Sequence, residues 1–161
     1  MYLQYQINHC RRCVYLLATF KGEWTKPLIE PLDNNFVKVE KIEYLGSNMN
    51  APKIILDYLD QLLRKTEENK IQGSLRENLS PISKVLLTLS MTHKPIRKYY
   101  KSQILPPLRD FSTRPEEGNT LRNKLCRLLT NADADIANEF AEFLFILCNK
   151  NRDRFVKHVG K

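Results

Sequence analysis

Apolar residues recur at intervals of three and four from about residue 50 onward, the spacing that places them on one face of an α-helix. The first such stripe combines Ile55, Leu59, Leu62 and Leu63. Four further stripes follow, and together the five predict helices over residues 53–66, 81–92, 95–103, 119–130 and 134–149. We therefore expect an all-α fold.

Prolines lie at the starts of these stripes or between them, and none interrupts a stripe. Ser80 followed by Pro81 is typical of a helix start, because serine caps free N–H groups and proline fits the first turn. Pro52 and Pro95 occupy similar positions. Each of these helices is expected to begin close to its proline.

The helix expected over 134–149 is apolar on all of its faces, because Ala137, Ala141, Phe145 and Ile146 lie outside its main stripe. A helix that is hydrophobic all round is buried all round. In a stacked helical solenoid the middle helix of each layer is covered in this way by its neighbours. The pattern therefore indicates a solenoid rather than an isolated helical hairpin.

The remaining chain carries weaker signals. Residues 22–50 indicate a long irregular connection, and within it residues 36–42 could form a short strand, a connector or a frayed helix. Residues 105–118 form a second connector, made rigid by a Pro-Pro pair. The chain is expected to be a single domain, with residues 1–42 its least regular part.

A repeat is visible when the chain is compared with itself. Residues 87–90, a polar turn and the basic-flanked pair in 98–101 are echoed by residues 145–148, a turn and residues 154–157. Each copy consists of a buried helix, a turn and a short helix whose aromatic residue or residues lie between basic residues. Such internal similarity is typical of helical-repeat proteins.

Several motifs resemble the synembryn family. They are Ile-Leu-Pro-Pro-Leu-Arg-Asp at 104–110, Thr-Arg-Pro-Glu at 113–116, Leu-Arg-Asn-Lys-Leu at 121–125 and Ala-Glu-Phe-Leu-Phe at 141–145. The resemblance extends over residues 43–160 and is weak before them. It is closest to the C-terminal half of the family's armadillo-repeat core.

The resemblance implies a segment of an armadillo/HEAT-like solenoid. It also implies binding to heterotrimeric G-protein α subunits (Gα), as a chaperone and guanine-nucleotide exchange factor that holds the C-terminal helix of Gα in a concave face. Such a factor needs no catalytic side chain and no cofactor, because it acts by shifting a conformational population. The flanking repeats of the family core are absent from these 161 residues, so we expect incomplete activity.

Arg97, Lys98 and Lys101 are the predicted partner-binding residues, because they cluster on one short helix without an acidic neighbour. Such a cluster suits acidic groups and a C-terminal carboxylate. The alternative is an ordinary solvated helix face. Tyr99 and Tyr100, between the basic residues, are expected in the core.

The net charge of +8 permits a second function, nucleic-acid binding through the Lys-Tyr-Tyr-Lys segment. A base-reading helical repeat needs equivalent polar positions in every repeat, and only the basic flanks recur here. The sequence contains neither a glycine-rich phosphate loop nor a nucleophile motif. The hypothesis we carry forward is therefore binding to Gα, with no enzymatic activity. The alternative is a basic helical-repeat module that binds nucleic acid or another protein.

Cys10 and Cys13 form a Cys-x-x-Cys motif that could begin a zinc site or act as a reactive pair. Cys126 and Cys148 are too widely spaced to supply the second ligand pair. Thiols on helix faces, without a metal, are the favoured interpretation. No apolar run approaches the length of a membrane span. We expect a cytoplasmic monomer, with any association with the cell cortex made through its partner.

Overall fold

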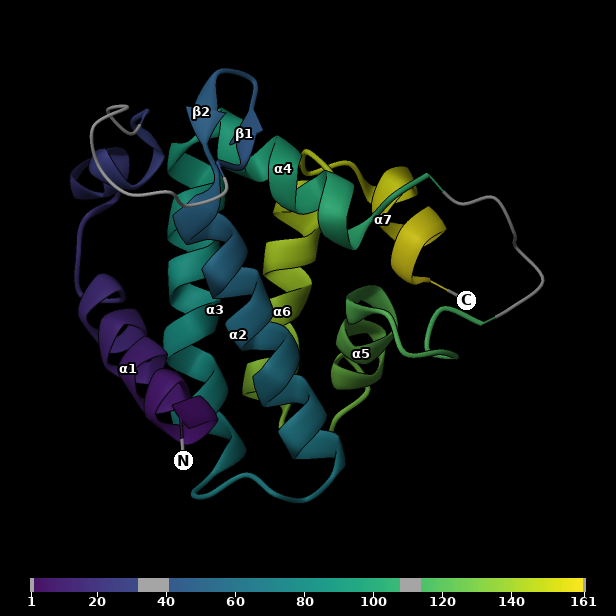
Figure 1. Cartoon of the computed structure of the whole chain (residues 1–161). Coiled ribbons are helices and arrows are strands. Elements are labelled where there is room, and N and C mark those ends of the chain that lie inside the picture. The colour runs from purple at the N-terminus through teal and green to yellow at the C-terminus, as the bar shows by residue number, and fades with distance from the viewer. Residues whose placement is uncertain (1, 32–40, 108–113, 161) are drawn as a thin grey trace.

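The computed structural model describes residues 2–31, 41–107 and 114–160. It is mostly helical, which confirms the all-α class, and Figure 1 shows its elements. In chain order they are α1 (Tyr2–Leu17), the 3-10 helix η1 (Gly22–Ile29), β1 (Glu43–Tyr44), β2 (Ser47–Asn48), α2 (Asn50–Glu67), α3 (Leu75–Thr92), α4 (Lys94–Ile104), α5 (Leu121–Leu128), α6 (Ala134–Leu147) and α7 (Arg152–Val159).

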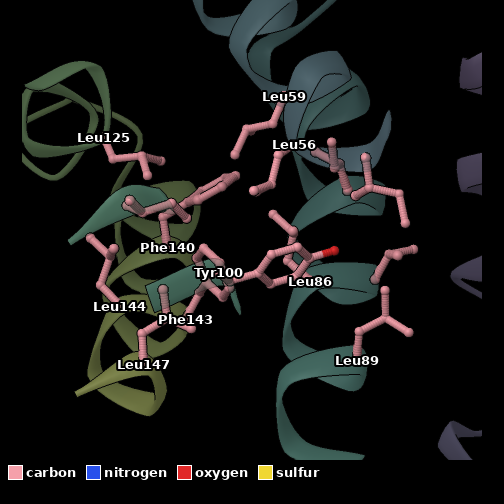
Figure 2. Close-up of a cluster of buried hydrophobic side chains, with 14 of the residues drawn as sticks. Leu56, Leu59, Leu86, Leu89, Tyr100, Leu125, Phe140, Phe143, Leu144 and Leu147 are labelled. Atoms are coloured by element: carbon pink, nitrogen blue, oxygen red, sulfur yellow. The ribbon is translucent and has the colours of Figure 1, made fainter. Parts of the chain in front are cut away.

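The centre of the fold is α3, which packs against α1, α2, α4 and α6. Figure 1 shows α4 crossing one end of α3 and α6, with α5 and α7 on the far side of α6. The core between these helices is aromatic as well as aliphatic, and Figure 2 shows Tyr100 lying between Phe143 of α6 and Leu86 of α3. The rings of Tyr100 and Phe143 meet edge-on at 6.2 Å, a favoured aromatic geometry.

The five predicted helices are present and their apolar stripes face the core. All four stripe residues of the first helix are buried, as are Tyr99 and Tyr100. In α6, Ala137 and Ile146 are buried outside the main stripe, whereas Ala141 and Phe145 are half-buried. The prediction of burial on all sides is thus confirmed for most of α6, and Glu142 marks an exposed face.

The predicted start of α3 at Ser80-Pro81 is wrong. The helix begins after Ser74, whose side chain accepts from the Glu77 backbone N–H while the Glu77 carboxylate accepts from the Ser74 N–H. This capping box leaves Pro81 inside the helix. Proline has no N–H, so the Glu77 carbonyl loses its helical donor. The hydroxyl of Tyr15, in α1, donates to that carbonyl at 2.7 Å.

The N-terminal segment is more regular than expected, because α1 covers residues 2–17. Its signal was present in the sequence, in apolar residues at positions 3, 7, 10, 14 and 17. Val14 is buried in the core. The following η1 is fixed by Thr25, whose hydroxyl lies 2.7 Å from Nε2 of His93 at the junction of α3 and α4.

The region over 22–50 contains regular structure as well. In addition to η1 it holds the antiparallel pair β1–β2, in which Tyr44 faces Ser47. Leu45 and Gly46 make the turn with positive φ angles of 52° and 72°, the left-handed conformation that two-residue hairpin turns require. Residues 36–40 of the candidate strand lie outside the described residues, and residues 41 and 42 do not belong to a strand.

Ion pairs join α5 to α2. The buried Lys124 Nζ lies 2.6 Å from Asp60, and Arg127 lies 2.7 Å from Glu67. Arg127 also donates to the carbonyls of Glu116 and Gly118, at the end of the second connector. These contacts fix α5 and the end of the second connector against α2.

Candidate partner-binding site

A basic pocket lies between α4 and α7, with a volume of about 500 Å³. Lys98 and Lys101 of α4 line it together with Arg154 and Lys157 of α7. Each pair has i,i+3 spacing, which places its two side chains on the same face of their helix. The other lining residues include no carboxylate among the described residues, and they are Tyr44, Ser102, Leu105, Pro107 and His158. We call these surroundings the basic pocket.

Two of the three predicted residues thus lie in one pocket, and the third does not line it. The half-buried Arg97 turns back toward α3, where its Nη1 donates to the Ser90 carbonyl at 3.2 Å. This bond fixes the tight turn between the two helices. Lys98 is exposed and Lys101 is half-buried. Neither forms an ion pair with any residue that the structure describes.

Sequence reasoning did not assign Arg154 and Lys157 to the site. Their signal was nevertheless visible, because the repeat aligns Arg154–Lys157 with Lys98–Lys101. The structure adds that the two short helices face one pocket. The basic residues that correspond in the two similar segments therefore line the same pocket.

The cations of the pocket act on the pKa values of two groups, His158 in the lining and the buried Cys148. Burial lowers the pKa of His158, and the nearby cations Arg122, Lys101 and Lys157 lower it further. Burial raises the pKa of Cys148, while Lys101 and Arg154 act in the opposite direction. Positive charges disfavour an imidazolium and favour a thiolate. An acidic group entering the pocket would therefore meet a positive potential.

The walls of the pocket are held in different ways. Tyr44 of the hairpin contacts Tyr99, with ring centroids 5.8 Å apart. On the other wall, the Phe155 ring meets Phe145 of α6 edge-on at 5.9 Å. The C-terminal end of α7 is held from α5, where Arg122 donates to the His158 carbonyl.

None of the four cysteines lines the basic pocket, and all four are free thiols. Burial raises the pKa of Cys10, and the neighbouring Cys13 raises it further. Within the described ranges, no group of three or more histidine, cysteine or acidic side chains has the arrangement of a metal site. Nor is any described helix both long and apolar enough to cross a bilayer.

Comparison with known proteins identifies what the chain is similar to. The family model described as "Guanine nucleotide exchange factor synembryn" (Ric8) matches residues 11–160, and so includes part of the region where the resemblance was expected to fade. The protein named Chaperone Ric-8A from Xenopus tropicalis is 45% identical over 125 residues, covering 76% of this chain and 22% of the relative. Chaperone Ric-8A from Gallus gallus is 44% identical over 124 residues, with 77% and 22% covered. The chain therefore spans about a fifth of the length of these relatives.

Proposed function

Because the chain belongs to the synembryn family of guanine nucleotide exchange factors, we propose that it contributes to binding the α subunit of heterotrimeric G proteins. The observation that carries the proposal is the family match over residues 11–160. The matched relatives are named chaperones, and the chain spans 22% of their length. We therefore propose partner binding for this segment, as part of the chaperone role named for the longer relatives and the exchange role named for the family.

The proposed scaffold is an armadillo/HEAT-like solenoid. It is supported by the succession of α1, α3 and α6, each packed on the next. It is also supported by the repeated order of a long buried helix and a short helix, first α3 with α4 and then α6 with α7. A solenoid stacks such units and offers an extended concave surface for a partner.

In the proposed mechanism the concave surface accepts the amphipathic C-terminal helix of Gα. Apolar grooves would take its hydrophobic face, and the basic pocket would take acidic groups or the terminal carboxylate. Holding that helix away from the nucleotide-binding domain favours the open form of Gα, which releases nucleotide. The synembryn-like chain needs no catalytic group for this, because tighter binding to one conformation is sufficient.

The test reverses the charge of the pocket residues on α4. We expect Lys98→Glu combined with Lys101→Glu to weaken binding to a peptide that copies the last turns of Gα, measured by calorimetry. A desolvated charge pair would lose about 2–5 kcal/mol, whereas charges at the rim would mainly slow association. Arg97→Glu is assayed separately, because its bond to Ser90 also fixes the α3–α4 turn.

The matched control is Arg11→Glu combined with Arg12→Glu, two exposed cations on α1. It changes the net charge by the same amount, away from the basic pocket. Equal losses from both double variants, or full affinity in the pocket variant, would reject the site. A salt titration separates the alternative function, because binding to nucleic acid falls steeply with salt through counterion release.

A further inference from the structure

The two halves of the basic pocket are attached to the fold unequally. On the α4 side, Tyr99, Tyr100 and Ile104 are buried in the core. On the α7 side no residue of the helix is buried. Phe155 and Val159 are only half-buried where they contact the core. The Arg154 and Lys157 side chains are therefore carried by an element that apolar burial alone holds weakly.

Arg122 makes a double hydrogen bond to the C-terminal end of α7. Its Nε and Nη2 donate to the carbonyl of His158 at 2.9 and 2.7 Å. The last carbonyls of a helix have no intrahelical donor and carry the negative end of the helix dipole. A guanidinium that donates twice to such a carbonyl fixes both the position and the rotation of the helix end.

The Arg122 contact joins α7 to α5 beside a pocket that four cationic side chains line. Lys98 and Lys101 face Arg154 and Lys157 without a carboxylate among the described lining residues. Like charges on two helices favour their separation. Arg122 does not itself line the pocket, and it contacts the main-chain carbonyl of the lining residue His158 rather than any of the four lining cations.

We propose that Arg122 is a positioning residue for the basic pocket: by clamping the end of α7 it holds Arg154 and Lys157 opposite Lys98 and Lys101, and so sets the affinity of the pocket for an anionic group. The inference rests on the proposed function in assigning a role to the pocket, but its physical content does not require the G protein. An anion that bridges α4 and α7 should hold α7 more firmly against the fold. The Arg122 contact should make this stabilisation of α7 by the anion larger.

The experiment compares the whole chain with its Arg122→Gln and Arg122→Lys variants by amide hydrogen exchange. In Arg122→Gln we expect protection of residues 152–159 to fall about tenfold, while α4 keeps its protection. Lysine retains the charge but not the paired donors, so Arg122→Lys should restore only part of the protection. Unchanged protection of α7 in Arg122→Gln would overturn the inference.

Sulfate is the probe for the pocket, with chloride at equal ionic strength as its control. Sulfate should raise the protection of α7 in the parent chain and much less in Arg122→Gln. Adding Lys157→Ala to Arg122→Gln should then lower the sulfate affinity little further. Loss of the Arg122 contact has already allowed α7 to carry Lys157 away from the pocket. If the two substitutions instead reduce the sulfate affinity by independent factors that multiply, Arg122 acts only on stability. That result would overturn the positioning role.

The Gα-derived peptide separates this inference from the proposed function. If sulfate docks α7 in the parent but the peptide does not bind, the proposed function fails and the clamp stands. If the peptide binds the parent and Arg122→Gln equally, the proposed function stands and the clamp fails. If both bind the parent and both weaken in Arg122→Gln, each proposal is supported by its own measurement.

Discussion

The pairs α3–α4 and α6–α7 have the same order of elements but not the same relation to the core. In α4 the aromatic pair between basic residues is buried, with Tyr100 completely inaccessible to solvent. In α7 the corresponding residues are the half-buried Phe155 and the exposed Val156. The same sequence pattern thus gives a core helix in one copy and a surface helix in the other. The difference arises because α4 is covered by the hairpin and lies against α3 and α6, whereas α7 lies mainly on α6.

The largest expected effect tests the buried half of this comparison. Phe143 is fully buried and its ring meets Tyr100 edge-on. Phe143→Ala should lower the free energy of unfolding by about 3–5 kcal/mol through lost burial and the cavity left behind. Thermal denaturation followed by circular dichroism should then lose its cooperative transition. A transition that survives near the parent's midpoint would place Phe143 outside the core.

A smaller effect is expected on the surface half. Phe155→Ala removes the edge-on contact with Phe145, and aromatic pairs of this kind contribute about 0.5–1.5 kcal/mol beyond burial. The main transition should move little, while amides of α7 exchange faster than those of α4. If Phe155→Ala instead unfolds the whole chain, α7 belongs to the same cooperative unit as α4 and the comparison fails.

The smallest effect has the opposite sign. The Tyr100 hydroxyl is buried without a hydrogen-bond partner among the described residues, and burial strongly raises its pKa. Since an unpaired buried hydroxyl is destabilising, Tyr100→Phe should raise the free energy of unfolding by about 1 kcal/mol. Tyr99→Phe is the matched control, and urea denaturation should detect no comparable gain. A clear loss of stability in Tyr100→Phe would mean that the hydroxyl is satisfied.

The sequence was sufficient for the elements whose signal is local. Helical stripes predicted α2 to α6 because burial imposes their spacing, and the repeat anticipated α7. The start of α3 was misplaced because Ser80-Pro81 imitates a cap, although Ser74 and Glu77 already formed the true capping pattern. The helix α1 was missed although its spacing was regular, so that error lay in the interpretation of the sequence.

The candidate site was only partly predictable for a different reason. Lys98 and Lys101 could be chosen from their cluster, but nothing local indicates that Arg154 and Lys157 line the same pocket. The contact between Arg122 and the His158 carbonyl joins residues 36 positions apart. Such contacts depend on how helices pack and on carbonyl positions, and neither appears in the pattern of side chains along the chain.

The proline inside α3 has a consequence for how the sequence can change. Pro81 deprives the Glu77 carbonyl of its helical donor, and the hydroxyl of Tyr15 replaces it from another helix. Substituting Tyr15 alone leaves that carbonyl without its donor, whereas substituting Pro81 with a residue that carries an N–H makes the phenol dispensable. Positions 15 and 81 are therefore coupled across 66 residues of sequence, and a neutral path of substitution through this pair changes the proline before the tyrosine.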